Sequence, residues 1–222
     1  MPRTRAFTLI ELLVVMAVIA ILSALLLSSI NHVKASAKAV TCVNNLRQWG
    51  TATQLYAADN HDYLPRDGTS TPDDHATNFG WYIQLPQQLG LPRYHDMPWR
   101  TNPFVNPGNS IWICPSNRRR CDTSKDTNNL FHYCLNKNVN GTGTGNQIKL
   151  VSIPHPSVTV WLFDNGKVGA VEQWNNVHTN LHNQGAQFVF LDGHVARFRN
   201  FEYWNFQTGE AITNNPKLVW IP

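Results

Sequence analysis

The first strong pattern along the chain is a long apolar run near its start. Residues 7–30 are almost wholly apolar, and Glu11 is the only charged residue among them. About 20 apolar helical residues are enough to cross a lipid bilayer, so the run predicts one transmembrane helix. The short basic leader before it favours a cytoplasmic N-terminus, although Lys34 and Lys38 behind it act in the opposite sense.

Two ordinary explanations fit this run less well. A cleaved secretory signal has an apolar region of about 7–15 residues followed by an A-x-A-like site. The run here is longer, and Leu22-Ser23-Ala24 matches that site poorly. A plain membrane anchor leaves Glu11 unexplained, because a carboxylate in hydrocarbon is unfavourable unless it finds a partner.

Apolar or small residues then recur at steps of three and four, which is the period of one helical face. This stripe consists of Val33, Ala37, Val40, Val43, Leu46, Trp49 and Thr53. No proline interrupts the pattern before Pro65, so it predicts one helix over residues 7–59 whose second half packs on a globular domain. Two helices with a break near Ser36 or Gly50 are the alternative.

Beyond Pro65 the chain alternates between turn-rich segments and short β-type runs. Pro, Asp, Asn and Gly are dense over residues 66–108, which predicts surface loops. The expected anchors of these loops are Trp81, Tyr82, Ile83 and Leu85. Apolar and β-branched residues predict strands at residues 111–113, 158–163 and 218–221.

The clearest strand signal is a hairpin. Two apolar runs, residues 187–191 and 194–198, flank the dipeptide Asp192-Gly193. Asp-Gly in this setting favours a two-residue type I′ turn, in which the residues on either side of the dipeptide face each other. Together the elements predict an α+β fold: a long N-terminal helix packed on a C-terminal antiparallel β-sheet domain with long loops.

The start of the apolar run is also a motif. Behind the basic leader stands Ala6-Phe7-Thr8-Leu9-Ile10-Glu11. This resembles the type IV prepilin processing signal: a basic leader, a small residue, Phe-Thr-Leu-Ile-Glu and an apolar helix. The resemblance implies that a prepilin peptidase cuts between Ala6 and Phe7 and methylates the new amino group of Phe7. The family's usual residue before the cut is Gly, from which Ala6 departs.

The same resemblance implies a role for Glu11 in assembly. In pilin-like filaments the helices stack with an axial stagger, and Glu11 would pair with the Phe7 ammonium of a neighbouring subunit. Coulomb attraction is strong at low dielectric, but desolvation offsets much of it. The pair is therefore expected to set the register between subunits more than to add stability.

By this resemblance the chain is a structural pseudopilin or prepilin-like subunit of a type II secretion or type IV pilus-like assembly, and no enzyme. The implied partners are prepilin peptidase, other pilin or pseudopilin subunits and the inner membrane; no nucleic acid, cofactor or metal is expected. The chain would cross the inner membrane once, with its N-terminus cytoplasmic before processing. The predicted division is a leader (1–6), a transmembrane helix (7–30), an extracytoplasmic helix (31–60) and a globular pilin-like head in the periplasm (61–222).

Further elements carry a second resemblance. Cys42-Val43-Asn44-Asn45-Leu46 is followed on the same predicted helix by Tyr56-Ala57-Ala58-Asp59-Asn60. Near the C-terminus, His182 is followed by nine residues and then Asp192-Gly193. These elements are similar to those of a pilin-like family of planctomycetes, verrucomicrobia and their relatives.

The four cysteines are Cys42, Cys114, Cys121 and Cys134. No two have Cys-x-x-Cys spacing, which argues against a zinc knuckle or a thioredoxin-type motif. Outside the cytoplasm disulfides can form among them, and the sequence leaves the pairing open.

A group of histidines and aspartates near the C-terminus is the candidate for other chemistry. Its members are Asp164, His178, His182, Asp192 and His194. Such side chains can bind a divalent metal, but a predicted strand separates His182 from Asp192. The preferred interpretation is that Asp192 serves the turn while His182 hydrogen-bonds a loop. Calcium held by loop oxygens stays open.

Two other functions also stay open. Eight tryptophans and loops rich in Asn and Asp suit a membrane-anchored extracytoplasmic module that binds a glycan, a surface polymer or DNA. An extracytoplasmic hydrolase has less support, because the chain holds no Gly-x-Ser-x-Gly element. The basic triplet Arg118-Arg119-Arg120 is expected to be solvated.

Overall fold

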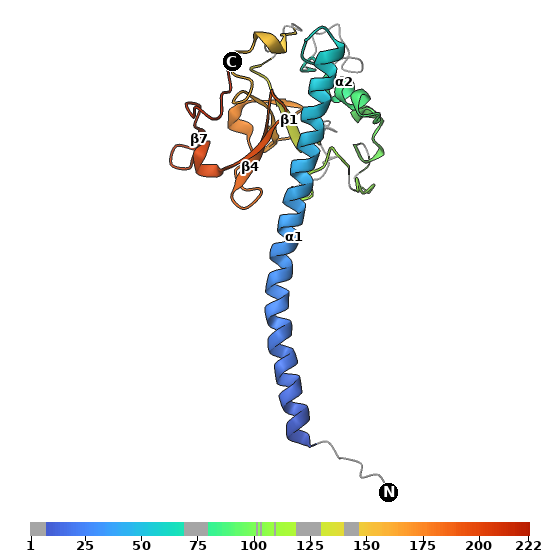
Figure 1. Cartoon of the computed structure of the whole chain (residues 1–222), viewed down its shortest axis with the longest axis vertical. Coiled ribbons are helices and arrows are strands. Elements are labelled where there is room, and N and C mark those ends of the chain that lie inside the picture. Colours follow the sequence, from blue (N-terminus) through green and yellow to red (C-terminus); the bar gives the residue numbers. More distant parts are fainter. Residues whose placement is uncertain are drawn as a thin grey trace. The chain divides into compact units, whose positions relative to one another are not determined.

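The computed structural model describes residues 8–68, 80–100, 102, 104–108, 110–118, 130–139 and 147–222, apart from the side chains of residues 27–29. The helices are α1 (Leu9–Asp59) and α2 (Trp81–Gln88), with 3₁₀ turns η1 (Tyr94–Asp96), η2 (Pro98–Arg100), η3 (Leu150–Ser152), η4 (Trp174–Asn176) and η5 (Asn200–Glu202). The strands are β1 (Tyr133–Asn136), β2 (Val160–Asp164), β3 (Val171–Glu172), β4 (Gly185–Phe190), β5 (Val195–Arg199), β6 (Trp204–Asn205) and β7 (Glu210–Ala211). The predicted α+β class is confirmed, because a long N-terminal helix is followed by a mainly antiparallel sheet (Figure 1).

Helix α1 continues without a break over 51 residues. The predicted helix is therefore confirmed from Leu9 onwards, and the alternative with a break near Ser36 or Gly50 is wrong. The chain divides into two compact units, called here the N-terminal unit (Met1–Ala37) and the C-terminal unit (Lys38–Pro222), and α1 contributes to both. The predicted domain boundaries after residues 30 and 60 stay predictions.

Within the C-terminal unit, α1 buries one face. Leu46 and Trp49 are fully buried, and the Trp161 Nε1–H donates to Thr53 Oγ1 at 2.8 Å. These positions follow the predicted steps of three and four. The predicted stripe is wrong over its first positions, since Val33 is 67% exposed and Val40 is 58% exposed.

The main sheet has five strands in the order β3-β1-β2-β4-β5. Neighbouring strands are antiparallel, except that β1 and β3 are parallel. Every residue of β1, β2 and β4 is buried, so both faces of the sheet are covered. This explains why the central strands have continuous apolar sequences instead of a strict alternation.

The two sheet faces belong to separate cores. On the face toward α1, Trp161 packs in the same cluster as Trp49. On the other face, Phe163 and Phe188 contact the ring of Trp220 near the C-terminus. The C-terminal segment therefore covers the face of the sheet that α1 leaves open.

The hairpin between β4 and β5 has a different turn from the predicted one. The Phe190 N–H donates to His194 O at 3.0 Å, and the Gly193 N–H donates to Phe190 O at 2.9 Å. Gly193 has φ +91, whereas Asp192 does not have a positive φ. The connection is thus a three-residue loop with a left-handed glycine, since a type I′ turn needs positive φ at both central residues. The predicted facing pairs are wrong by one residue.

The contacts of Leu191 account for the longer loop. Its side chain is fully buried, its N–H donates to Thr159 O at 3.1 Å, and its carbonyl accepts from Gln54 Nε2. Both backbone groups are satisfied outside the hairpin, so Leu191 has no need of a partner across the strands.

The strand predicted at residues 111–113 is absent from the described structure. Asn45 Nδ2 donates to Ile113 O at 3.0 Å, and Trp49 Nε1 donates to Ile111 O at 3.3 Å. Side chains of α1 thus satisfy carbonyls that a strand would have offered to a neighbouring strand.

Two further local predictions are wrong, and four strands were missed: β1 and the two-residue strands β3, β6 and β7. The surface loops predicted over residues 66–108 are interrupted by α2, although the expected anchors Trp81, Tyr82, Ile83 and Leu85 are all buried. Residues 218–221 form only an isolated bridge between Val219 and Thr159. Strand β1 was not predicted, because its four residues carry no turn signal and no alternation.

Candidate functional site

The first candidate residues lie at the start of α1. Ala6 and Phe7, the predicted processing residues, are outside the described residues. The Thr8 N–H and hydroxyl both donate to Glu11 Oε2 at 2.8 Å, and the Glu11 N–H donates to Thr8 Oγ1 at 3.3 Å. This reciprocal arrangement is a capping box. The Glu11 carboxylate therefore already has hydrogen-bond donors within its own chain.

The N-terminal unit has an apolar surface. Among the described residues, α1 is the helix that is long and apolar enough to cross a membrane. Its large apolar side chains are exposed there, with Leu9 at 83% and Leu22 at 54%. A helix that is apolar on all sides needs lipid or other helices around it.

Two of the four cysteines are joined. Cys42 on α1 and Cys114, which precedes β1, form a disulfide across a sequence separation of 72. Cys134 on β1 is free and buried, and Cys121 lies outside the described residues. Burial raises the pKa of the Cys134 thiol well above its ordinary value, and two nearby carboxylates add to the shift. Cys134 is therefore a protonated, unreactive thiol in the folded chain.

The fold brings His182 to Asp164 and not to Asp192. His182 Nε2 lies 3.2 Å from Asp164 Oδ2, and both side chains are fully buried. The same Nε2 lies 3.5 Å from Cys114 Sγ. The expectation that the His182 ring bonds to a loop is wrong as to its main partner, which is a carboxylate at the end of β2.

Asp192 and Gly193 have a separate task in the β4–β5 loop. Asp192 Oδ1 accepts from the His194 N–H at 3.0 Å and lies 2.6 Å from His194 Nδ1. Gly193 O lies so near α1 that a Cβ placed on Gly50 would be 2.8 Å from it. The pair of glycines thus lets the hairpin turn dock directly on the helix.

An unusual backbone turns His182 inward. His182, Asn183 and Gln184 have φ of 47, 59 and 59, three successive left-handed residues. Each such non-glycine residue is disfavoured by roughly 1–2 kcal/mol. Arg197 stabilises this turn, because its Nε donates to His182 O at 2.7 Å and its Nη2 donates to Asn183 O. The loop therefore keeps the imidazole buried even though its own backbone conformation is unfavourable. Such backbone strain clusters at functional sites.

Asp164 is the most deeply buried member of the group of histidines and aspartates. Its Oδ2 also accepts from the Gln187 N–H at 2.7 Å, while its Oδ1 and His182 Nδ1 are buried with no hydrogen-bond partner among the described residues. Burial raises the pKa of Tyr133 and of Tyr203, and the Asp164 carboxylate adds to both shifts. The buried Asp164 carboxylate thus helps to keep both of these phenol groups protonated.

This geometry argues against a catalytic role for the cluster. A Cys-His-Asp relay needs the thiol on one ring nitrogen and the carboxylate on the other. Here Cys114 Sγ and Asp164 Oδ2 both face His182 Nε2, and Cys114 is tied up in the disulfide. The arrangement can hold a structure or a metal, but it cannot pass a proton from Cys114 to Asp164.

Sequence reasoning missed the task of Asn45. Its Nδ2 donates to Ile113 O and lies 3.3 Å from the Tyr133 hydroxyl, to which it also donates. Cys42, Asn45 and Leu46 of the Cys-x-x-Asn-Leu element are all buried. Their i, i+3, i+4 spacing was the available signal that all three face the domain.

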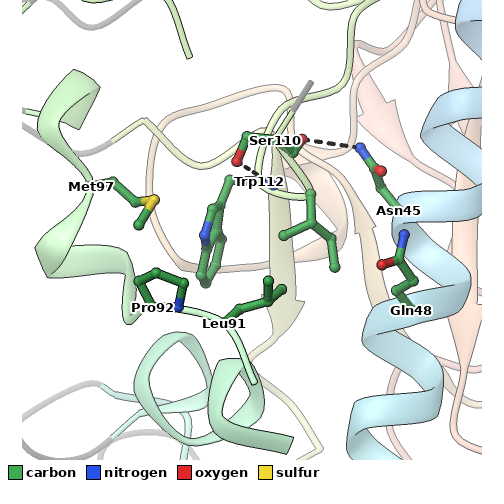
Figure 2. Close-up of a pocket in the computed structure, with 8 residues that line it drawn as sticks. Asn45, Gln48, Leu91, Pro92, Met97, Ser110 and Trp112 are labelled. Carbon is green, nitrogen blue, oxygen red and sulfur yellow. Dashed lines mark hydrogen bonds between the residues drawn. The ribbon is translucent and has the colours of Figure 1, made fainter. Parts of the chain in front are cut away.

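A small cavity lies beside this element. Asn45 and Gln48 project from α1 on one side, and Leu91, Pro92 and Met97 line the other, with Trp112 between them (Figure 2). Its volume is about 260 Å³. Ligand pockets typically have roughly 300–1,000 Å³, so this notch suits a single side chain better than a substrate.

Comparison with known proteins adds one finding. Residues 1–27 match the family model of the prokaryotic N-terminal methylation motif. No curated protein and no solved structure matches the chain. The motif is typical of type IV pilin-like proteins, which are structural subunits rather than enzymes and are processed by prepilin peptidase. Because the match ends at residue 27, the similarity of the C-terminal unit to the planctomycete and verrucomicrobial family stays a prediction.

Proposed function

We propose that the chain is a pseudopilin-like structural subunit of a type II secretion or type IV pilus-like assembly. The observation that carries the proposal is the methylation motif at residues 1–27, which stands on an apolar helix that continues into a folded α+β domain. A methylation motif needs a membrane segment directly behind it, and a filament subunit needs a folded domain attached to its helix. This chain has both.

The exposed apolar side chains of the N-terminal unit support membrane anchoring before assembly. Burying apolar surface is favourable by roughly 25 cal/mol per Å². Lipid supplies that burial in the membrane, and the helices of other subunits supply it in a filament. The proposed location is the inner membrane, with one span and the C-terminal unit in the periplasm. The Cys42–Cys114 disulfide agrees with an oxidising compartment.

The capping box suggests how Glu11 behaves in this role. In the single chain, the carboxylate accepts two hydrogen bonds from Thr8. In the assembly it would instead receive the Phe7 ammonium of a neighbouring subunit, which carries a full positive charge. A charged partner at low dielectric attracts the carboxylate more strongly than a neutral donor does, but desolvation offsets much of that gain, so the exchange would set the register between subunits more than add stability.

The direct test is mass spectrometry of the N-terminus after co-expression with an active prepilin peptidase. The expected product starts at a methylated Phe7. The Ala6→Gly variant, which restores the family's usual residue, should be cut at least as fast, and a catalytically inactive peptidase should leave the chain whole. An intact N-terminus with the active peptidase would overturn the proposal and favour a plainly anchored binding module.

A second test addresses Glu11. The Glu11→Gln variant can still accept the hydrogen bonds from Thr8 but has no charge, whereas Glu11→Ala loses both. Both variants should be processed normally and both should fail to co-purify with sister subunits. Normal incorporation of Glu11→Gln would show that the charge is not what assembly requires.

A further inference from the structure

Three metal-ligating side chains lie together inside the C-terminal unit, and a fourth, that of Asp164, lies next to one of them, His182. Cys42 comes from α1, Cys114 precedes β1, Asp164 ends β2, and His182 lies in the left-handed loop. The ligand atoms of the two cysteines and His182 lie within 4.8 Å of one another, and Asp164 Oδ2 is 3.2 Å from His182 Nε2. All four residues are buried. The two sulfurs are joined as a disulfide.

We propose that, when the Cys42–Cys114 disulfide is reduced, these four residues bind a zinc ion. The ligands are the two thiolates, the Nε2 atom of His182 and the carboxylate of Asp164. Zinc favours such a tetrahedral set of sulfur, imidazole nitrogen and carboxylate oxygen. This inference departs from the expectation of no metal, and it does not depend on the proposed assembly function.

Two of the separations between ligand atoms already suit the ion. With Zn–S of about 2.3 Å and Zn–N of about 2.0–2.1 Å, tetrahedral geometry puts S and N about 3.5 Å apart and N and O about 3.3 Å apart. Cys114 Sγ and His182 Nε2 are 3.5 Å apart, and His182 Nε2 and Asp164 Oδ2 are 3.2 Å apart. To bind the ion, the two sulfurs have to separate from each other, and the Asp164 carboxylate has to move toward them, because it lies outside the group of three ligand atoms within 4.8 Å.

Neighbouring groups hold the ligands in these positions. The Gln187 N–H fixes Asp164 Oδ2, and Arg197 fixes the strained turn that carries His182. Asp164 Oδ1 is buried with no hydrogen-bond partner in the described part of the chain, which an ion next to the carboxylate would compensate. Such supporting contacts are typical of built metal sites.

The chemistry balances with a dithiol as the reductant. The dithiol transfers two electrons and two protons, its own sulfurs become a disulfide, and Cys42 and Cys114 become free thiols. Zinc then displaces the two thiol protons into solvent. The imidazole binds as the neutral tautomer with its proton on Nδ1. Either state ties α1 to the segment before β1, by a covalent bond or by the ion.

The test uses the full chain in detergent, with Co²⁺ as a spectroscopic probe and then Zn²⁺. After anaerobic reduction by a phosphine, the wild type should take up one Co²⁺ with visible bands of tetrahedral cobalt and thiolate charge transfer, and Zn²⁺ should displace it. The oxidised wild type should take up none, which controls for adventitious sites without any mutation. His182→Ala and Asp164→Asn should each weaken Zn²⁺ binding by at least about tenfold.

Cys134→Ser is the matched control, because Cys134 is also buried but lies outside the cluster; its binding should be unchanged. Near-ultraviolet circular dichroism of the tryptophans reports whether the reduced chain stays folded. The proposal is overturned if the folded, reduced wild type binds no cobalt, or if reduction unfolds the chain and zinc does not restore it. Retention of the cobalt bands in Cys114→Ser would also overturn it.

Discussion

The two halves of α1 use the same kind of residue in opposite ways. In the N-terminal unit Leu22 is 54% exposed and Leu9 is 83% exposed, whereas in the C-terminal unit Leu46 and Trp49 are fully buried. The first half is apolar on every side, and the second half is apolar on one face only. A helix of the first kind needs an apolar surrounding, which the described residues of this chain do not supply. A helix of the second kind finds it in its own fold.

The difference shows that apolar composition predicts a helix without saying what covers it. Coverage depends on whether apolar residues are arranged as a stripe or as a full circle. All eight tryptophans lie in the C-terminal unit, so their fluorescence reports on that unit alone. Each half can therefore be perturbed and read separately.

The largest effect is expected from one substitution made in each half. Leu46→Ala should lower the free energy of unfolding of the C-terminal unit by about 2–5 kcal/mol, because it leaves a cavity beside Trp49. Leu22→Ala should leave that value unchanged within about 0.5 kcal/mol, since its side chain has no part in that core. Denaturant unfolding in detergent, followed by tryptophan fluorescence, measures both. Equal losses of unfolding free energy in the two variants would show that the two halves of α1 do not differ in this way.

A glycine in the helix sharpens the comparison. Replacing an ordinary helical glycine by alanine stabilises by about 1 kcal/mol. At Gly50 the new Cβ would lie 2.8 Å from Gly193 O, so Gly50→Ala should destabilise the C-terminal unit by about 1–2 kcal/mol. Ser36→Ala, at an exposed position of the same helix, should be nearly neutral. A stabilising Gly50→Ala would mean that the hairpin turn does not dock on α1.

The smallest effect concerns alkaline pH. In the folded state burial holds the pKa of the Cys134 thiol well above its ordinary value, so above about pH 8.5 only the unfolded chain loses this proton. Folding stability should then fall with rising pH by up to about 1.4 kcal/mol per unit. The N-terminal unit contains no cysteine or tyrosine, so no thiol or phenol contributes to this effect there.

Unfolding curves at several alkaline pH values, with the disulfide intact, measure the slope. Cys134→Ser should remove the part of it that begins near pH 8.5, while the buried tyrosines still contribute at higher pH. An unchanged slope in this variant would show that Cys134 is not the source.

Much of the fold could be predicted, because much of it is decided by near neighbours. The apolar run and the absence of proline before Pro65 placed α1 almost to the residue, and shorter apolar runs placed β2, β4 and β5. Helix α2 was missed because Gly80 precedes it and Pro86 lies inside it, which are turn signals, whereas Trp81 packs on the distant Trp49. The hairpin register was missed because Leu191 prefers partners outside the hairpin.

The candidate site divides in the same way. The spacing between His182 and Asp192 singled out both residues, but a carboxylate on β2 is the real partner of His182. No local rule connects residue 164 with residue 182, or Cys42 with Cys114. These pairs exist because sheet pairing and the left-handed loop bring distant segments together.

By itself the sequence determined the processing motif, the apolar helix and the α+β class, since each depends on residues within one or two turns or strands of each other. Only the tertiary structure decided the Cys42–Cys114 bond, the His182–Asp164 pair and the contact between Gly50 and Gly193. The physical reason is that local preferences of neighbouring residues favour a helix, a strand or a turn. Burial and side-chain pairing depend instead on which distant segments the fold brings next to each residue.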